Sequence, residues 1–116
     1  MSSASFHILI AENEITHAIV LQRMLEKRYP EARIEVVSSI QEYQSLIAAV
    51  SPTIVLLDLN LDDGNTLDML KAATAPPAFP VVMMSSSASI QMAAEAVQAG
   101  AVDFIIKSPD VFFSRF

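Results

Sequence analysis

Ile54-Val-Leu-Leu-Asp-Leu-Asn-Leu-Asp-Asp-Gly64 lies near the middle of this chain of 116 residues. Its first four residues are apolar without alternation, which is typical of a strand buried on both faces of a parallel sheet. The run ends in Asp58, and the turn-forming sequence Asp62-Asp63-Gly64 follows it. A carboxylate at the exit of a central strand lies where open α/β sheets bind their ligands. Taken alone, Asp58 could equally be a helix cap or a turn residue.

The length and composition of the chain exclude several classes of protein. Hydrophobic residues make up 53% of the chain, and its length allows one domain with one core. No apolar run approaches the length of a membrane span, and no signal-peptide pattern opens the chain. The lack of cysteine excludes disulfides and cysteine-based zinc sites and fits the cytoplasm. A formal net charge of −6 argues against a nucleic-acid surface, and two glycines are too few for a Walker or GxGxxG loop.

Patterns on both sides of the central strand predict that strands alternate with helices. Further strands are predicted at residues 6–11, Arg33–Val37, 81–84 and 102–106. Helices are predicted at Ile15–Arg28, at 40–50 behind a cap at Ser38 or Ser39, around Leu67 and Leu70, and at 90–97. Gly100 is well placed for a left-handed cap at the end of the last helix. This order predicts an α/β fold with a parallel sheet and right-handed crossovers.

Polar residues follow four of the five predicted strands. Strand one leads into Glu12 and Asn13, the central strand into Asp58, the fourth into Ser85 and the fifth into Lys107. The carboxyl ends of parallel strands meet at one edge of a sheet, so we expect these groups to form one site. Carboxylate and amide oxygens suit a hard cation such as Mg²⁺.

Asp58 at that site could act as a nucleophile toward phosphorus and form an acyl phosphate. A lysine and a hydroxyl nearby would hold the other phosphoryl oxygens. The two histidines have no predicted part in this chemistry. We expect His7 to be structural or exposed, and His17 has no Cys, His or Glu at metal-ligand spacing.

Four segments together resemble the receiver domain of two-component response regulators. They are Ile8-Leu-Ile-Ala-Glu-Asn-Glu14, the stretch from Ile54 to Gly64, Pro80-Val-Val-Met-Met-Ser85 and Gly100-Ala-Val-Asp-Phe-Ile-Ile-Lys107. The resemblance spans almost the whole chain with the spacing of the family. It implies a flavodoxin-like fold, which is a doubly wound, five-stranded parallel sheet of order 2-1-3-4-5 with helices on both faces.

The resemblance also implies roles for residues. Asp58 matches the phosphoacceptor, Ser85 the switch hydroxyl and Lys107 the phosphate-binding lysine. The implied Mg²⁺ ligands are Glu12, Asn13, Asp58 and the backbone carbonyl of Asn60. In this interpretation the chain is a signalling domain and not an enzyme in its own right, although it assists its own phosphorylation and dephosphorylation.

The implied partners follow from the same family. A sensor histidine kinase or a histidine phosphotransferase would supply the phosphoryl group, and an output domain or a downstream protein would respond. A homodimer is possible, a cytoplasmic location is expected, and no direct binding to nucleic acid or membrane is expected.

Four positions depart from the pattern of the family. Asn13 replaces the second acid, Asp62 replaces a proline, and Phe104 replaces the tyrosine of strand five. The usual Lys-Pro is interrupted as Lys107-Ser108-Pro109, which resembles receivers that precede sensory or output domains.

We expect residues 1–116 to be a single receiver domain and a piece of a longer protein. Residues 110–116 are too few for a full final helix, so we expect them to begin a fifth helix that is cut short.

Three other interpretations remain open at this stage. An FMN-binding flavodoxin shares the fold, but Glu12 and Glu14 would repel its phosphate. An aspartyl-phosphate hydrolase would need a second acid two positions after Asp58, where this chain has Asn60. A degenerate receiver would no longer accept phosphate and would serve only as a docking module. Asn13 supports this last interpretation, and the presence of Asp58, Ser85 and Lys107 argues against it.

Overall fold

A computed structural model describes residues 6–87 and 89–108, which fold around one parallel sheet. Its main strands are β1 (His7–Ala11), β2 (Arg33–Val37), β3 (Ile54–Asp58), β6 (Val81–Ser85) and β7 (Asp103–Ile106). They are ordered β2-β1-β3-β6-β7, and every neighbouring pair is parallel. In chain order this is 2-1-3-4-5, so the predicted fold and strand order are confirmed.

The central position of β3 explains its unbroken apolar sequence. Ile8 of β1 pairs with Ile54 on one side, and Val81 of β6 pairs with Val55 on the other. From Val55 onward every residue of β3 is buried. A strand with neighbours on both edges and helices over both faces has no solvent-facing positions, so alternation with polar residues is lost.

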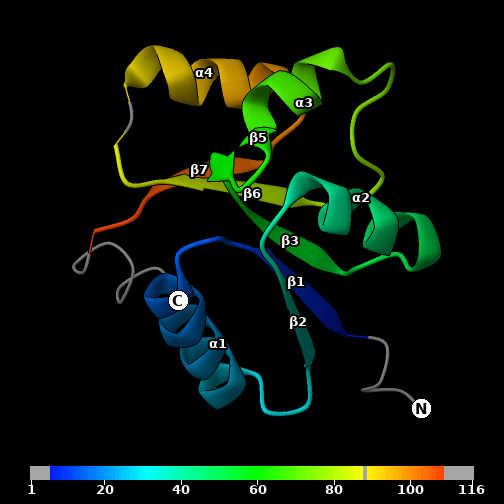
Figure 1. Ribbon diagram of the computed structural model, residues 1–116, viewed down its shortest axis with the longest axis vertical. Coiled ribbons are helices and arrows are strands. Elements are labelled where there is room, and N and C mark those ends of the chain that lie inside the picture. The colour runs from blue at the N-terminus through cyan, green and yellow to red at the C-terminus, as the bar shows by residue number, and fades with distance from the viewer. Residues whose placement is uncertain (1–5, 88, 109–116) are drawn as a thin grey trace.

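Helices cover both faces of the sheet, as Figure 1 shows. The helix α1 (Ile15–Arg28) lies on one face. Three others lie on the opposite face, namely α2 (Ile40–Ala49), α3 (Thr66–Ala72) and α4 (Ile90–Gln98). This arrangement is the doubly wound architecture that alternating strands and helices produce when all crossovers share one hand.

Two hydrophobic cores correspond to the two faces. On the α1 face, Leu21 and Leu25 of the helix pack with Ile10, Leu56 and Met84 of the sheet. The other core is larger and joins alternate residues of the same strands to α2, α3 and α4. Its buried members are Leu9, Ala11, Tyr43, Val55, Leu57, Leu59, Leu61, Leu67, Leu70, Val81, Met83, Ala96 and Ala101.

Side-chain caps fix the starts of three helices. The side chain of Ser39 accepts a hydrogen bond from the Glu42 amide at the start of α2, so of the two predicted caps it is Ser39 that is used. Asn65 does the same for α3, and Ser89 for α4. Each oxygen satisfies an amide that has no partner inside its helix.

Gly100 follows the end of α4 with a φ of +114°, which confirms the positive φ predicted there. The amide of Gly100 donates to the Val97 carbonyl, and the next amide donates to the Ala96 carbonyl. A Cβ atom at this position would lie only 2.8 Å from the Pro77 side chain. Gly100 is therefore required both by the backbone conformation and by the close approach of the loop before β6.

One element was not predicted from the sequence. The strands β4 (Asn60–Leu61) and β5 (Gly64–Asn65) form a two-stranded antiparallel sheet within the loop after β3. With two residues each, they are too short to show any hydrophobic period. His7 fits the structural role expected for it, because it is buried with Nε2 2.9 Å from Glu35 Oε1, although the two atoms are poorly aligned for a hydrogen bond.

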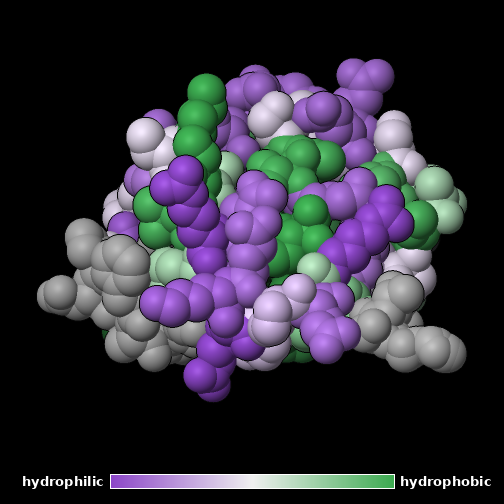
Figure 2. Space-filling view, turned by 90° about the horizontal axis from the view of Figure 1, so that it is seen from below, coloured by the Kyte–Doolittle hydropathy of each residue, from purple (hydrophilic) through white to green (hydrophobic). Residues whose placement is uncertain are grey.

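The surface of the described residues is mixed in character. Seen from below the view of Figure 1, hydrophilic side chains surround separate hydrophobic areas (Figure 2). Within residues 6–87 and 89–108, no helix has the length and apolar character needed to cross a membrane. The predicted start of a fifth helix in residues 110–116 lies outside the described residues.

Candidate functional site

The strand exits meet at the carboxyl edge of the sheet. Glu12, Asp58 and Ser85 are polar residues that follow or end three neighbouring strands, and all three are buried. The backbone joins the exits: the Leu59 amide donates to the Met84 carbonyl, and the Lys107 amide donates to the Ser85 carbonyl. Parallel pairing brings these groups together, because it aligns the ends of strands that are far apart in the sequence.

Lys107 links the two buried acids. Its ammonium nitrogen lies 2.8 Å from Glu12 Oε1 and 3.0 Å from Asp58 Oδ1. The side chains of Lys107 and Glu12 are 4% and 0% exposed, so water screens these contacts very little. The three residues that the sequence placed at the ends of the first, central and fifth main strands are therefore joined through Lys107.

The electrostatic balance of the site is negative. Burial raises the pKa of the Asp58 carboxyl, the hydrogen bond from Lys107 lowers it, and the charge of Glu12 raises it again, with a net upward shift. When both buried carboxylates are ionised, the single ammonium leaves one negative charge uncompensated. A site with this charge attracts a further cation, and it repels an anion unless a cation accompanies that anion.

Ser85 also lies at this edge of the sheet, but its hydroxyl is hydrogen-bonded within the loop that follows β6. The Ser85 Oγ donates to the Ser87 carbonyl at 2.6 Å and accepts from the Ser87 amide at 3.3 Å. This hydroxyl must exchange its bond to Ser87 before it can donate to a group bound at Asp58.

The two amide residues of the predicted metal site are exposed. Asn13 lines a surface cavity of about 290 Å³ together with Glu12 and residues of α1 and β2. Asn60 is paired with Asn65 in the short β4–β5 sheet. Neither amide side chain is among the contacts that hold Lys107, Glu12 and Asp58 together in the described residues.

The donor set nevertheless suits Mg²⁺. Among residues 6–87 and 89–108, no group of three or more His, Cys, Asp or Glu side chains is arranged to hold a metal. The chain instead offers the buried carboxylates of Glu12 and Asp58, and exposed asparagines follow them in the sequence at positions 13 and 60. Oxygen ligands of this kind, with room left for water, are what Mg²⁺ prefers.

Two residues that support the loop after Asp58 were missed in the sequence. The hydroxyl of Thr66 is fully buried and donates to the Asp58 carbonyl at 2.8 Å. The Asp63 carboxylate accepts from the Ile40 amide at 2.6 Å and from the Gln41 amide at 3.1 Å, at the start of α2. These hydrogen bonds lower the pKa of Asp63.

His17 was also missed as a neighbour of the site. Its Nδ1 lies 3.1 Å from the Lys107 nitrogen. The only indication of this contact in the sequence was a polar residue in the first turn of the helix that follows Glu12. The apolar spacing of the helix indicates its buried face, but it does not show that residue 17 reaches Lys107.

Phe104 and Ser108 lie close to the site in sequence but differ in setting. Phe104 is partly buried against the larger core, and the hydrogen bond that a tyrosine hydroxyl would make is not available to it. Ser108 donates its amide to the Ile106 carbonyl. The following Pro109 lies outside the described residues.

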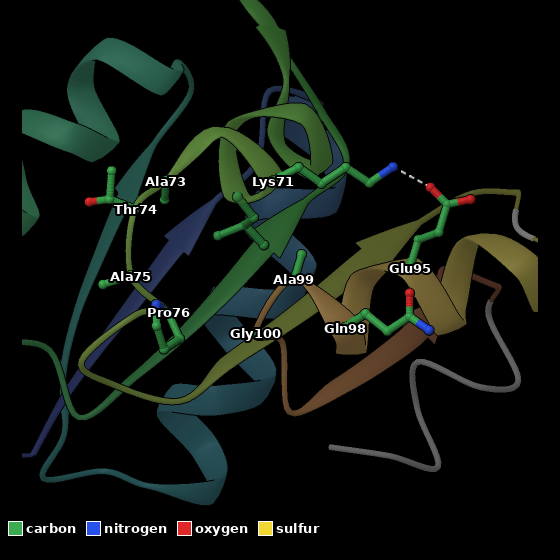
Figure 3. Close-up of a pocket in the computed structure, with 10 residues that line it drawn as sticks. Lys71, Ala73, Thr74, Ala75, Pro76, Glu95, Gln98, Ala99 and Gly100 are labelled. Carbon is green, nitrogen blue, oxygen red and sulfur yellow. Dashed lines mark hydrogen bonds and ion pairs between the residues drawn. The ribbon is translucent and has the colours of Figure 1, made fainter.

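A separate cavity of about 420 Å³ lies between the ends of α3 and α4 (Figure 3). It is bordered by the ion pair of Lys71 and Glu95 and by the loop that contains Pro76. None of the predicted site residues lines it.

Comparison with known proteins agrees with this geometry. The chain matches the model of the response regulator receiver domain over residues 8–111. It is 30% identical over 110 residues to the methanogenesis regulatory protein FilR1 of Methanothrix harundinacea, and this alignment covers 91% of the chain and 25% of the relative. It is 28% identical over 111 residues to the transcriptional regulatory protein ZraR of Klebsiella oxytoca, covering 95% of the chain and 25% of the relative.

A solved structure gives the same result. The signal receiver domain of a DNA-binding response regulator from Colwellia psychrerythraea 34H is similar with a TM-score of 0.79 at 26% identity, over 88% of this chain and 85% of that one. The chain spans about a quarter of the length of the curated relatives that it matches. The family match over most of the chain, together with the fold and the strand-end residues, shows that this chain belongs to the response regulator receiver domain family.

Proposed function

We propose that this chain accepts a phosphoryl group on Asp58 and thereby switches an output partner. The observation that carries the proposal is the buried contact of Asp58 Oδ1 with the Lys107 ammonium at 3.0 Å, beside the buried Glu12. A carboxylate kept at a strand exit, with a lysine beside it and a second acid nearby, has the groups that phosphoryl transfer needs.

The chemistry is a displacement at phosphorus. An oxygen of the Asp58 carboxylate forms the new P–O bond, and the P–N bond of a phosphohistidine donor breaks. The electron pair of the broken bond leaves with the imidazole nitrogen, which takes a proton from solvent. The product is a mixed anhydride on Asp58, and one phosphoryl group is transferred without any change in oxidation state.

Lys107 and Ser85 have distinct parts in this proposal. The Lys107 ammonium already lies beside the accepting carboxylate and can hold a phosphoryl oxygen by a charge-assisted hydrogen bond. The Ser85 hydroxyl would leave the Ser87 carbonyl and donate to another phosphoryl oxygen, which couples phosphorylation to the loop after β6. Bound Mg²⁺, held by Glu12, Asn13, Asp58 and the carbonyl of Asn60, would offset the negative charge of the carboxylates and the phosphoryl group.

The partners belong to the same proposal. The donor would be a sensor histidine kinase or a histidine phosphotransferase, and the receiver of the signal would be an output domain or a downstream protein. We place this exchange in the cytoplasm and regard the chain as a signalling domain that assists its own phosphorylation and dephosphorylation. A homodimer would be one way of passing on the signal.

Phosphorylation with a small donor tests the proposal directly. The protein is incubated with acetyl phosphate and Mg²⁺, and its intact mass is measured. We expect the mass of one phosphoryl group to be added to the wild type and to Asp68→Asn, a control that removes an exposed acid in α3. Asp58→Asn should remain unmodified.

Two outcomes would contradict this proposal. Labelling that persists in Asp58→Asn would show that another residue accepts the phosphoryl group. A folded wild type that takes up none, from acetyl phosphate or from a phosphorylated histidine phosphotransferase, would favour a phosphate-independent docking module.

A further inference from the structure

The Lys107 ammonium has a third neighbour besides the two acids. An ammonium carries three N–H donors and no acceptor. Among the described residues its contacts are Glu12 Oε1 at 2.8 Å, Asp58 Oδ1 at 3.0 Å and His17 Nδ1 at 3.1 Å. Three donors therefore face three acceptors, and the imidazole of His17 provides one of them.

The geometry of this contact suits one tautomer of His17. Because an ammonium can only donate, the contact is a hydrogen bond when Nδ1 carries the lone pair and the ring hydrogen is on Nε2. Of the three acceptors, His17 is the uncharged one. The other two are carboxylates that the proposed function also assigns to the cation and to the phosphoryl group.

The backbone places His17 where this contact is possible. The Glu12 carboxylate accepts from the Glu14 amide at 3.0 Å through Oε2, while its Oε1 accepts from Lys107. The Glu14 carbonyl in turn accepts the Ala18 amide in the first turn of α1. One buried carboxylate thus holds both the start of the helix that carries His17 and the ammonium that His17 contacts.

We propose that His17 is a positioning residue for Lys107 in phosphoryl transfer, an inference that rests on the proposed function. When a cation shares Glu12 and a phosphoryl group joins Asp58, both carboxylate contacts of Lys107 change. The His17 contact uses neither carboxylate oxygen directly. It keeps the flexible lysine side chain beside Asp58, so that the ammonium meets the phosphoryl oxygens in a restricted range of positions.

Substitutions at position 17 separate this role from a structural one. His17→Leu removes the acceptor, whereas His17→Asn keeps an oxygen at nearly the position of Nδ1 and has a similar helix propensity. Gln44→Leu is the control, because this residue is exposed and lies in α2, on the face of the sheet opposite to α1.

The first measurement is the rate of phosphorylation of the whole chain by acetyl phosphate at saturating Mg²⁺, followed by intact mass. We expect His17→Leu to be slower by roughly tenfold, the effect of losing one hydrogen bond to a charged group. His17→Asn should recover most of the rate, and Gln44→Leu should match the wild type. A His17→Leu protein that is phosphorylated as fast as the wild type would overturn the inference alone, whereas a wild type that takes no phosphoryl group would overturn the proposed function.

The second measurement does not depend on phosphorylation. Nitrogen-15 NMR of the imidazole rings at pH 8 reports which ring nitrogen carries the hydrogen. We expect His17 to hold its hydrogen on Nε2 in the wild type and its Nδ1 resonance to shift in Lys107→Met, while the signals of the remote His7 stay unchanged. A His17 signal that is the same with and without the ammonium would refute the contact and the positioning role.

Discussion

Removal of the Lys107 charge is expected to destabilise the metal-free protein. In Lys107→Met the side chain keeps much of its length, but Glu12 and Asp58 lose the ammonium that lies 2.8 and 3.0 Å from them. One charge pair at about 4 Å with an effective dielectric near 20 is worth roughly 4 kcal/mol. Breaking a buried pair from one side typically costs about 3–5 kcal/mol, because the remaining charge stays buried.

The pKa of Asp58 sets the dependence of this loss on pH. Burial already raises the pKa of Asp58 above 3.8, and without the lysine that pKa rises further, so the carboxyl can relieve the repulsion by binding a proton. We therefore expect a loss of about 2–4 kcal/mol at pH 7.5. A carboxyl whose pKa is raised by folding favours the folded state below its unfolded pKa, and this stability is lost as the pH rises through the folded pKa. The loss in Lys107→Met should accordingly be small near pH 4 and grow toward pH 7.5.

Urea unfolding followed by far-UV circular dichroism measures these free energies. Lys71→Met is the matched control, because Lys71 also pairs with a glutamate, Glu95, but its side chain is 46% exposed. The control should change stability little, since exposed pairs contribute little. Added Mg²⁺ should stabilise Lys107→Met more than the wild type, because the emptied site is more negative. A loss no larger than that of Lys71→Met, or one that shrinks as the pH rises, would refute the reasoning.

Three further substitutions test the surroundings of the site. Asn13→Asp should tighten Mg²⁺ binding by roughly 5- to 150-fold, because a restored negative charge contributes about 1–3 kcal/mol to the binding free energy. The same substitution should slightly destabilise the metal-free protein. Titration with Mg²⁺ checks the affinity, and melting with and without Mg²⁺ checks the stability. Thr66→Val should lower the free energy of urea unfolding by about 1–2 kcal/mol because a buried hydroxyl bond to the Asp58 carbonyl is lost, and Thr66→Ser should lose less. Asp63→Ala should lower the melting temperature and the helix content through α2, whereas Asp62→Ala should do neither.

The fold could be predicted from the sequence because its strands and helices have strong and different patterns. The unbroken apolar run before Asp58 indicated a central strand, and Gly100 marked the end of α4. The main strands and helices lie close to their predicted positions because each is long enough to show a period. The β4–β5 pair was missed since two residues show none.

The candidate site could be predicted in part for a related reason. Glu12, Asp58 and Lys107 follow strands whose ends must coincide in a parallel sheet, so topology alone brought them together. The contact of His17 with Lys107 depends on the rotation of α1 about its axis, which packing against the sheet determines. The bond of Asp63 to α2 depends on a turn meeting a helix 22 residues away from it in sequence.

The bond between Asp63 and α2 also provides a natural reporter of motion near the site. The Ile40 and Gln41 amides can exchange their hydrogens with solvent only while the Asp63 carboxylate is released from them. Asp63 lies in the same short loop as Asn60, two residues after the end of β4. The exchange rates of these two amides therefore measure how often the loop beside Asp58 opens, without any label and without a bound partner.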